Sequence, residues 1–144
     1  MSRRVDAMFR AFADFTRLRL LHLLAQDELC VAELMAALKA PQSKVSRHLA
    51  HLRAAGLADS RNKGKWRYYS LAAPSTRFQA RIFKCLRDCH EEVGVLNRDR
   101  LRLEKVLAER RGRRRRRAGA AAAALLLGAL AAGRARADDY PIRP

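Results

Sequence analysis

The apolar positions in the N-terminal half of the chain recur at spacings of three and four, the period of helices that bury one face. This pattern predicts helices at residues 5–13, 16–25 and 31–38, and a fourth helix between Pro41 and Gly56. In the fourth helix, Val45, Leu49 and Leu52 fall on one side and are expected to be buried.

After Gly56 the period changes to the alternation that is typical of strands. Residues 57–61 and 65–71 are expected to pair as a hairpin, with Asn62-Lys63-Gly64 as the turn and Gly64 supplying a positive φ. From Pro74 to about Arg110 the pattern is helical again. The order α-α-α-α-β-β-α predicts a mainly α fold with a small β-hairpin wing, which is a winged helix-turn-helix.

The polar positions of the fourth helix are suited to a DNA major groove. Glutamine pairs with adenine, arginine with guanine and serine with either, and an alanine methyl group can contact thymine. Basic side chains at the hairpin tip are suited to phosphates. The alternative is a solvated face on a core helix, followed by a solvated turn. The predicted DNA contacts are Gln42, Ser43, Lys44, Ser46, Arg47, His48, Ala50, His51 and Arg53 on the helix, and Arg61, Lys63 and Lys65 on the hairpin.

Several separate blocks of residues 5–110 resemble the ArsR/SmtB repressors. They include ADFTRLRLL at 13–21, ELCV at 28–31, SRHL at 46–49, AGL at 55–57 and YYSL at 68–71. The resemblance implies a homodimeric repressor that binds a palindromic operator in double-stranded DNA. It also implies release from DNA when a metal ion, a metalloid ion or a thiol oxidant is sensed. Phe15 stands where the family usually has proline, which is expected to alter only the loop before the second helix.

The composition agrees with a nucleic-acid partner. The formal net charge is +17, of which residues 1–110 carry +10 and residues 111–144 carry +7. Such a basic chain attracts nucleic acid or an anionic membrane surface. The sequence lacks a phosphate-binding glycine loop, a nucleophile elbow and a metal-hydrolase motif, so it predicts a regulator and not an enzyme. Three cysteines without an N-terminal signal peptide predict a cytoplasmic protein with free thiols.

The cysteines are the candidate sensing residues. Cys85 and Cys89 are spaced i, i+4 on a predicted helix, which places both sulfurs on one side. As(III) and Sb(III) prefer two or three soft thiolates. Arsenic-sensing relatives often have ELCVCEL where this chain has ELCVAEL, so Cys30 offers a single sulfur there. We therefore expect no permanently bound cofactor, and As(III) or Sb(III) as an inducer held by Cys85 and Cys89, with Cys30 as a candidate third ligand.

Two alternatives use the same cysteines differently. Cys85 and Cys89 would pack as small apolar residues in a dimer interface if they bind nothing. Alternatively, Cys30 would be oxidised to a disulfide with Cys85 or Cys89, as in relatives that sense sulfide or peroxide. That reaction requires Cα atoms within about 7 Å.

The predicted first and last helices carry more apolar surface than one small core needs. Phe9 and Phe12 belong to the first helix, and Phe78 and Ile82 to the last. Part of this surface is therefore expected to meet a second subunit. The two recognition helices of such a dimer would lie about one DNA turn apart.

The last 34 residues, 111–144, differ in character from the predicted 1–110 domain. Arg113–Arg117 precede an Ala/Leu-rich stretch at 118–133, and an Ala-x-Ala site follows. This order resembles a secretory signal peptide, and DDYPIRP resembles the mature start of a tricarboxylate-type periplasmic solute-binding protein. The tail is expected to be a fused reading frame or a poorly packed helical extension. Membrane contact is the less favoured alternative.

Overall fold

The computed structural model describes the backbone of residues 2–137 and the side chains of residues 3–129. The chain divides into two units, Met1–Val106 and Leu107–Pro144. The predicted residues 138–144 of the tail lie outside the described part. Among the described residues, no helix is long and apolar enough to cross a membrane.

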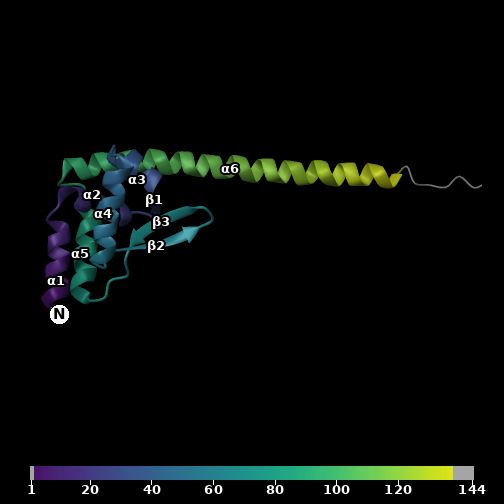
Figure 1. The fold of residues 1–144 in the computed structure, drawn as a ribbon. Coiled ribbons are helices and arrows are strands. Elements are labelled where there is room, and N and C mark those ends of the chain that lie inside the picture. The colour runs from purple at the N-terminus through teal and green to yellow at the C-terminus, as the bar shows by residue number, and fades with distance from the viewer. Residues whose placement is uncertain (1, 138–144) are drawn as a thin grey trace, which may run out of the picture. The chain divides into compact units, whose positions relative to one another are not determined.

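The first unit is a winged helix-turn-helix, which confirms the predicted fold class (Figure 1). Its elements are α1 (Ser2–Phe12), α2 (Phe15–Leu24), β1 (Leu29–Cys30), α3 (Val31–Leu38), α4 (Gln42–Ala54), β2 (Ala58–Lys63), β3 (Trp66–Leu71), α5 (Arg77–Asp88) and the first part of α6 (Gly94–Ala137).

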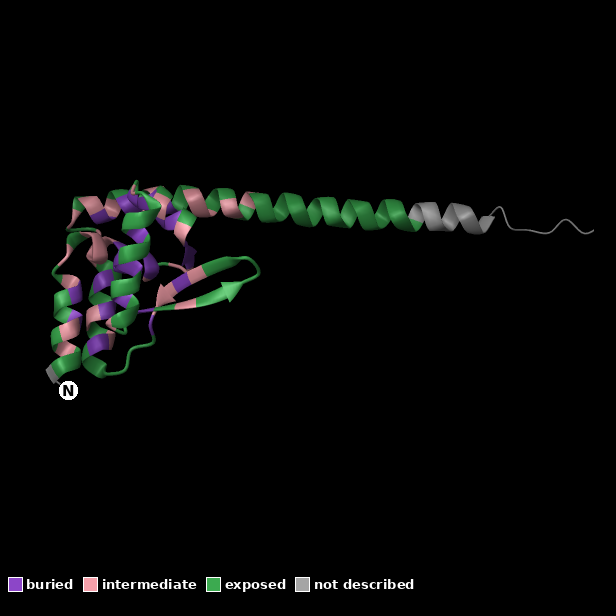
Figure 2. Ribbon diagram, in the orientation of Figure 1, coloured by how far each residue is buried: buried purple, intermediate pink, exposed green. Residues whose placement is uncertain are grey.

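Helix α2 lies within the core of this unit. Its last five residues, Leu20 to Leu24, are all buried, so this half of α2 is enclosed on every side and not along a single stripe. The predicted inner face of α4 is confirmed, because Val45, Leu49 and Leu52 are each 0% exposed. Figure 2 shows this buried core between the helices, with the hairpin tip and the outer face of α4 exposed.

The wing is the outer part of a three-stranded antiparallel sheet with the order β1-β3-β2. The predicted turn at 62–64 began two residues too early and ended one residue too early. Asn62 pairs with Arg67 and Lys63 with Trp66, so the loop consists of Gly64 and Lys65, and Gly64 adopts φ +60°. Strand β1 was not expected, because two residues are too few to show an alternating pattern.

The predicted single helix from Pro74 to Arg110 is wrong. The chain leaves helical geometry after Asp88, and a new helix begins at Gly94, a residue with low helix propensity. The turn between α5 and α6 allows Leu96 and Leu103 of α6 to be buried at 0% and 1% exposure. Helix α6 then continues without a break to Ala137, which confirms that the Ala/Leu-rich stretch is helical as far as it is described.

Candidate nucleic-acid interface and thiol pair

Helix α4 presents a polar face to solvent. Its inner side is fixed by Val45, Leu49 and Leu52, which are fully buried. The residues predicted to contact DNA that are exposed on this helix are Gln42, Ser43, Lys44, Ser46, Arg47, Ala50, His51 and Arg53. Because Val45, Leu49 and Leu52 are buried, the opposite face of the helix, which carries these side chains, is turned to solvent. This arrangement suits contacts to base edges.

The turns on both sides of α4 use left-handed residues. Before the helix, Lys39 adopts φ +52°, and the N–H of Ala40 donates to the Met35 carbonyl at 3.2 Å. After the helix, Gly56 adopts φ +68°, and the N–H of Leu57 donates to the Leu52 carbonyl at 2.9 Å. The bond from Leu57 to Leu52 is the hydrogen bond that closes a Schellman motif. Glycine is favoured at the left-handed position of this motif, which Gly56 occupies. The end of α3 and the end of α4 are therefore each closed by a backbone hydrogen bond.

His48 does not belong to the exposed face, so its prediction as a DNA contact is corrected. It is 7% exposed, and its Nδ1 lies 3.7 Å from Oδ1 of Asp14. Burial lowers the pKa of His48, and the Asp14 carboxylate opposes that shift. Sequence reasoning placed His48 beside Arg47, but the helical period turns it toward α2. Its structural role is to contact the residue that caps α2.

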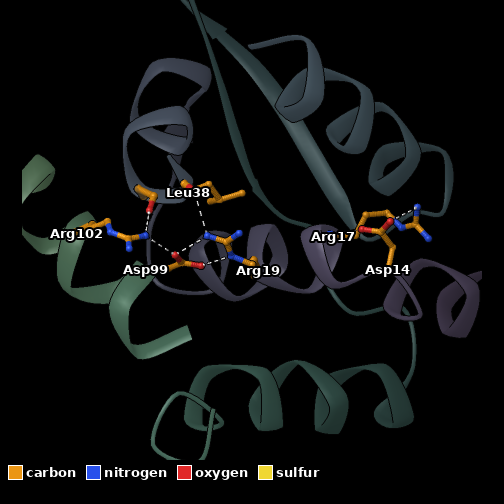
Figure 3. Close-up of polar contacts among 7 residues, drawn as sticks. Asp14, Arg17, Arg19, Leu38, Asp99 and Arg102 are labelled. Atoms are coloured by element: carbon orange, nitrogen blue, oxygen red, sulfur yellow. Dashed lines mark hydrogen bonds and ion pairs between the residues drawn. The ribbon is translucent and has the colours of Figure 1, made fainter. Parts of the chain in front are cut away.

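Asp14 connects α1, α2 and α4. Its Oδ1 accepts the Arg17 N–H at 2.9 Å as the N-cap of α2, and this bond is the main reason that the pKa of Asp14 is lowered. The Arg17 guanidinium also lies 3.8 Å from Oδ2 of Asp14 (Figure 3). Arg17 in turn donates to the Ala11 and Arg10 carbonyls, both at 2.8 Å, at the end of α1. This cluster fixes the start of α2, against which α4 packs.

A second cluster connects the middle of α2 to the end of α3. The carboxylate of Asp99 on α6 is 0% exposed and accepts two hydrogen bonds from Arg19, at 2.6 and 2.8 Å. Arg19 also donates to the Leu38 carbonyl at 3.1 Å (Figure 3). Arg102 donates to Asp99 at 3.0 Å and to the Ala37 carbonyl at 3.2 Å. The last carbonyls of α3, directly before the turn into α4, are thus held by arginines.

One of the three basic wing residues predicted to contact DNA is already ion-paired within the protein. Arg61 forms a bidentate ion pair with Glu28, and its Nη2 lies 2.6 Å from Oε2. Lys63 and Lys65 are exposed at the tip. Arg67 on β3 is also exposed and donates to Oδ1 of Asn62 at 3.3 Å; it was not among the predicted DNA contacts. Its signal was its place on the polar side of the alternating strand.

Cys85 and Cys89 lie together at the end of α5. Cys85 is exposed and Cys89 half-buried, and the N–H of Cys89 donates to the Cys85 carbonyl at 3.0 Å. The Cys89 thiol donates to the Leu86 carbonyl at 3.3 Å. Burial and then the neighbouring Cys85 raise the pKa of Cys89, so its thiol is protonated at neutral pH.

Cys30 is placed differently. It is 8% exposed at the start of α3, where its N–H donates to Oε2 of Glu33 at 2.9 Å. Burial is the main cause that raises the pKa of Cys30. Among the residues whose side chains are described, no three His, Cys, Asp or Glu side chains gather into a group that could hold a metal ion. Within one chain, therefore, Cys30 does not complete a three-cysteine site with Cys85 and Cys89.

His22 connects the thiol pair to the core. Its Nδ1 lies 2.6 Å from the same Leu86 carbonyl that accepts the Cys89 thiol. A carbonyl can only accept, so Nδ1 of His22 carries the hydrogen. The ring of His90 lies 5.6 Å from that of His22. Burial lowers the pKa of His22, which is therefore neutral at pH 7. Sequence reasoning missed His22 because nothing local marks it.

Known proteins resemble this chain in both sequence and structure. The bacterial regulatory protein arsR family matches residues 14–60. Arsenic resistance transcriptional regulator ArsR1 of Pseudomonas putida is 42% identical over 100 residues, which cover 69% of this chain and 77% of the relative. The arsenical resistance operon repressor of Escherichia coli is 42% identical over 86 residues, covering 59% of this chain and 74% of the relative.

Solved structures also resemble this chain in fold. The solution structure of the homodimeric winged helix-turn-helix DNA-binding domain Mb0332 from Mycobacterium bovis aligns with a TM-score of 0.53 and 30% identity, covering 62% of this chain and 80% of that one. The exposed recognition helix and the wing are the DNA-binding elements of this fold. ArsR1 of Pseudomonas putida matches this chain over most of its length. The chain belongs to the ArsR/SmtB family of winged helix-turn-helix DNA-binding transcriptional regulators.

Proposed function

We propose that the chain is a homodimeric repressor that leaves its operator when As(III) or Sb(III) binds Cys85 and Cys89. The observation that carries the DNA part is the exposed polar face of α4 above three fully buried residues. In this proposal Ser43, Ser46 and Arg47 contact base edges, while Lys63 and Lys65 on the wing contact phosphates.

The dimer is supported by apolar side chains that the first unit leaves exposed. Helix α5 buries Phe83 and Leu86 but exposes Phe78 at 44%. Phe9 of α1 is 51% exposed, and its ring centroid lies 6.1 Å from that of Phe78. An exposed aromatic pair across two adjacent helices is typical of a protein interface. A two-fold axis at this surface would pair two recognition helices with a palindromic operator.

The inducer is supported by the accessibility and spacing of the thiols. A thiol that replaces one hydroxyl group of arsenous acid forms an As–S bond and releases one water, so Cys85 and Cys89 together would release two. Cys85 is exposed, which gives the ion access to the pair. A third position on the ion is left for solvent or a small thiol. Two of the relatives named above are arsenic resistance regulators.

The Leu86 carbonyl provides a link from the thiols to the DNA-binding face. Arsenic binding removes the thiol hydrogen by which Cys89 donates to this carbonyl, and His22 of α2 bonds to the same oxygen. Helix α2 contacts α4. A ligand at the thiols would therefore change packing under the recognition helix. The coupling is reciprocal, so operator DNA is expected to weaken arsenite binding by the same factor.

The alternative is a thiol-based redox or persulfide switch between Cys30 and Cys85 or Cys89. The burial of Cys30 and its raised pKa disfavour it, because oxidants react with an accessible thiolate. Mass spectrometry of the treated protein distinguishes the two mechanisms. Peroxide or persulfide would leave a cross-link, whereas arsenite would leave a reversible adduct.

One titration tests the proposal. A DNA mobility shift on the promoter beside the gene is followed with arsenite, antimonite, zinc, cadmium and peroxide. Arsenite and antimonite are expected to release the wild-type protein and the Cys30→Ser control, but not the Cys85→Ser, Cys89→Ser double variant. Release of that double variant by arsenite would exclude this site, and release by peroxide alone would favour the redox switch.

A further inference from the structure

The second unit of the chain is a helix with a strongly basic beginning. Between residues 107 and 129, seven arginines stand against one glutamate. Arg113 pairs with Glu109 at 3.6 Å, and the following arginines up to Arg117 are exposed. Successive helical residues are rotated by about 100°, so five consecutive arginines point to all sides of the helix. The charge therefore forms a collar and not a stripe.

The helix is apolar directly after this collar. Residues 118–129 are all alanine, glycine or leucine. Leu125, Leu126 and Leu127 are 76%, 67% and 68% exposed, the largest exposures among the large hydrophobic residues of the described chain. They too are consecutive, so the apolar surface also surrounds the helix. Exposed apolar surface of this kind indicates a partner.

We propose that α6 beyond Val106 binds an anionic lipid bilayer, with Arg113–Arg117 among the headgroups and Leu125–Leu127 in the outer acyl region. DNA phosphates would attract the arginines but would give the leucines no contact. A protein groove or a second copy would cover one side of the helix, whereas here charge and apolar surface both surround it. Lipid is the partner that surrounds a helix and presents anionic headgroups beside hydrocarbon.

The length of the helix sets the depth of insertion. The apolar residues 118–133 span about 24 Å at about 1.5 Å per residue, less than the roughly 30 Å of a hydrocarbon core. Insertion into one leaflet is therefore expected. Because the arginine collar stays at the headgroups, binding should need anionic lipid and weaken with salt. The regulator would then be distributed between membrane and operator, independently of the arsenic proposal.

The test is flotation of the full-length protein with vesicles. We expect binding to vesicles of phosphatidylglycerol and phosphatidylcholine in equal parts, little binding to phosphatidylcholine alone, and weaker binding at about 0.5 M than at about 0.1 M NaCl. Replacing Arg113–Arg117 by glutamine should reduce vesicle affinity at least about tenfold. Replacing Leu125, Leu126 and Leu127 by serine should reduce vesicle affinity but leave affinity for non-operator DNA unchanged.

Operator binding by the glutamine and serine variants shows that the first unit is folded. The Lys63→Ala, Lys65→Ala variant, which removes two positive charges outside the collar, is the matched control and should float like the wild type. Full vesicle binding by the serine variant would overturn the proposal, as would wild-type protein that stays unbound with anionic vesicles. If the glutamine variant loses affinity only for non-operator DNA, the collar is a DNA contact and the lipid proposal is wrong.

Discussion

At the scale of single residues, the buried histidines give the first unit its response to acid. Burial is the main cause that lowers the pKa of both His22 and His48. An unfolded chain protonates histidine below about pH 6.5, whereas the folded chain resists protonation. The contribution to stability is therefore present above that pH and is lost as pH falls toward the folded pKa.

We expect the free energy of unfolding to fall between about pH 7 and pH 5, and His22→Gln to flatten this dependence. Glutamine can still donate to the Leu86 carbonyl but does not titrate. Urea unfolding at both pH values measures the difference, with the exposed His51→Gln as a matched control. Equal slopes for wild type and His22→Gln would contradict this account.

Contacts set by local spacing could be predicted from the sequence, whereas contacts between distant residues could not. Val45, Leu49 and Leu52 were predicted as buried because helical spacing is local. The bonds from His22 to Leu86 and from Arg19 to Asp99 join residues 64 and 80 positions apart, and only the fold brings these side chains together. His48 was misassigned because residue type favoured DNA while the helical phase favoured the core.

At the scale of elements, the basic residues of the wing differ in whether they are paired within the protein. Arg61 on β2 is paired with Glu28 just before β1, whereas Lys63 and Lys65 stand at the tip. The alternation of β3 predicted the hairpin, but no sequence pattern could indicate Glu28, which the unexpected β1 brings to the wing. The break between α5 and α6 was missed for a similar reason, since its cause is the burial of α6 residues.

For the wing we expect Arg61→Ala to lose less operator affinity than Lys63→Ala, because the Arg61 charge is already compensated. Glu28→Gln should release Arg61 and steepen the dependence of log affinity on log salt by about one. Fluorescence anisotropy with an operator duplex over a salt series measures both. A larger loss for Arg61→Ala than for Lys63→Ala would show that the ion pair opens on DNA.

At the scale of the whole molecule, the first unit is expected to function as a dimer. Serine at both Phe9 and Phe78 should shift the protein from dimer to monomer in sedimentation at micromolar concentration. It should also weaken operator binding, because one half-site alone binds less tightly. Phe15→Ser is the control, since Phe15 is 52% exposed but lies outside this aromatic pair. A wild-type monomer at that concentration would contradict the proposed dimer.

The limits of the first unit and the origin of the tail remain predictions. The sequence placed a boundary after residue 110 from composition, and the signal-peptide resemblance depends partly on residues 138–144, which the structure does not describe. A separate start codon ahead of the arginine run in the transcript would support a fused reading frame.

The most direct measurement is operator binding by a Ser46→Ala, Arg47→Ala variant. Both side chains are exposed on α4, so the fold should be retained. Each lost base contact is expected to reduce operator affinity by about 1–3 kcal/mol, while affinity for non-operator DNA falls much less. Undiminished binding to the operator by this variant would contradict the claim that the outer face of α4 recognises DNA.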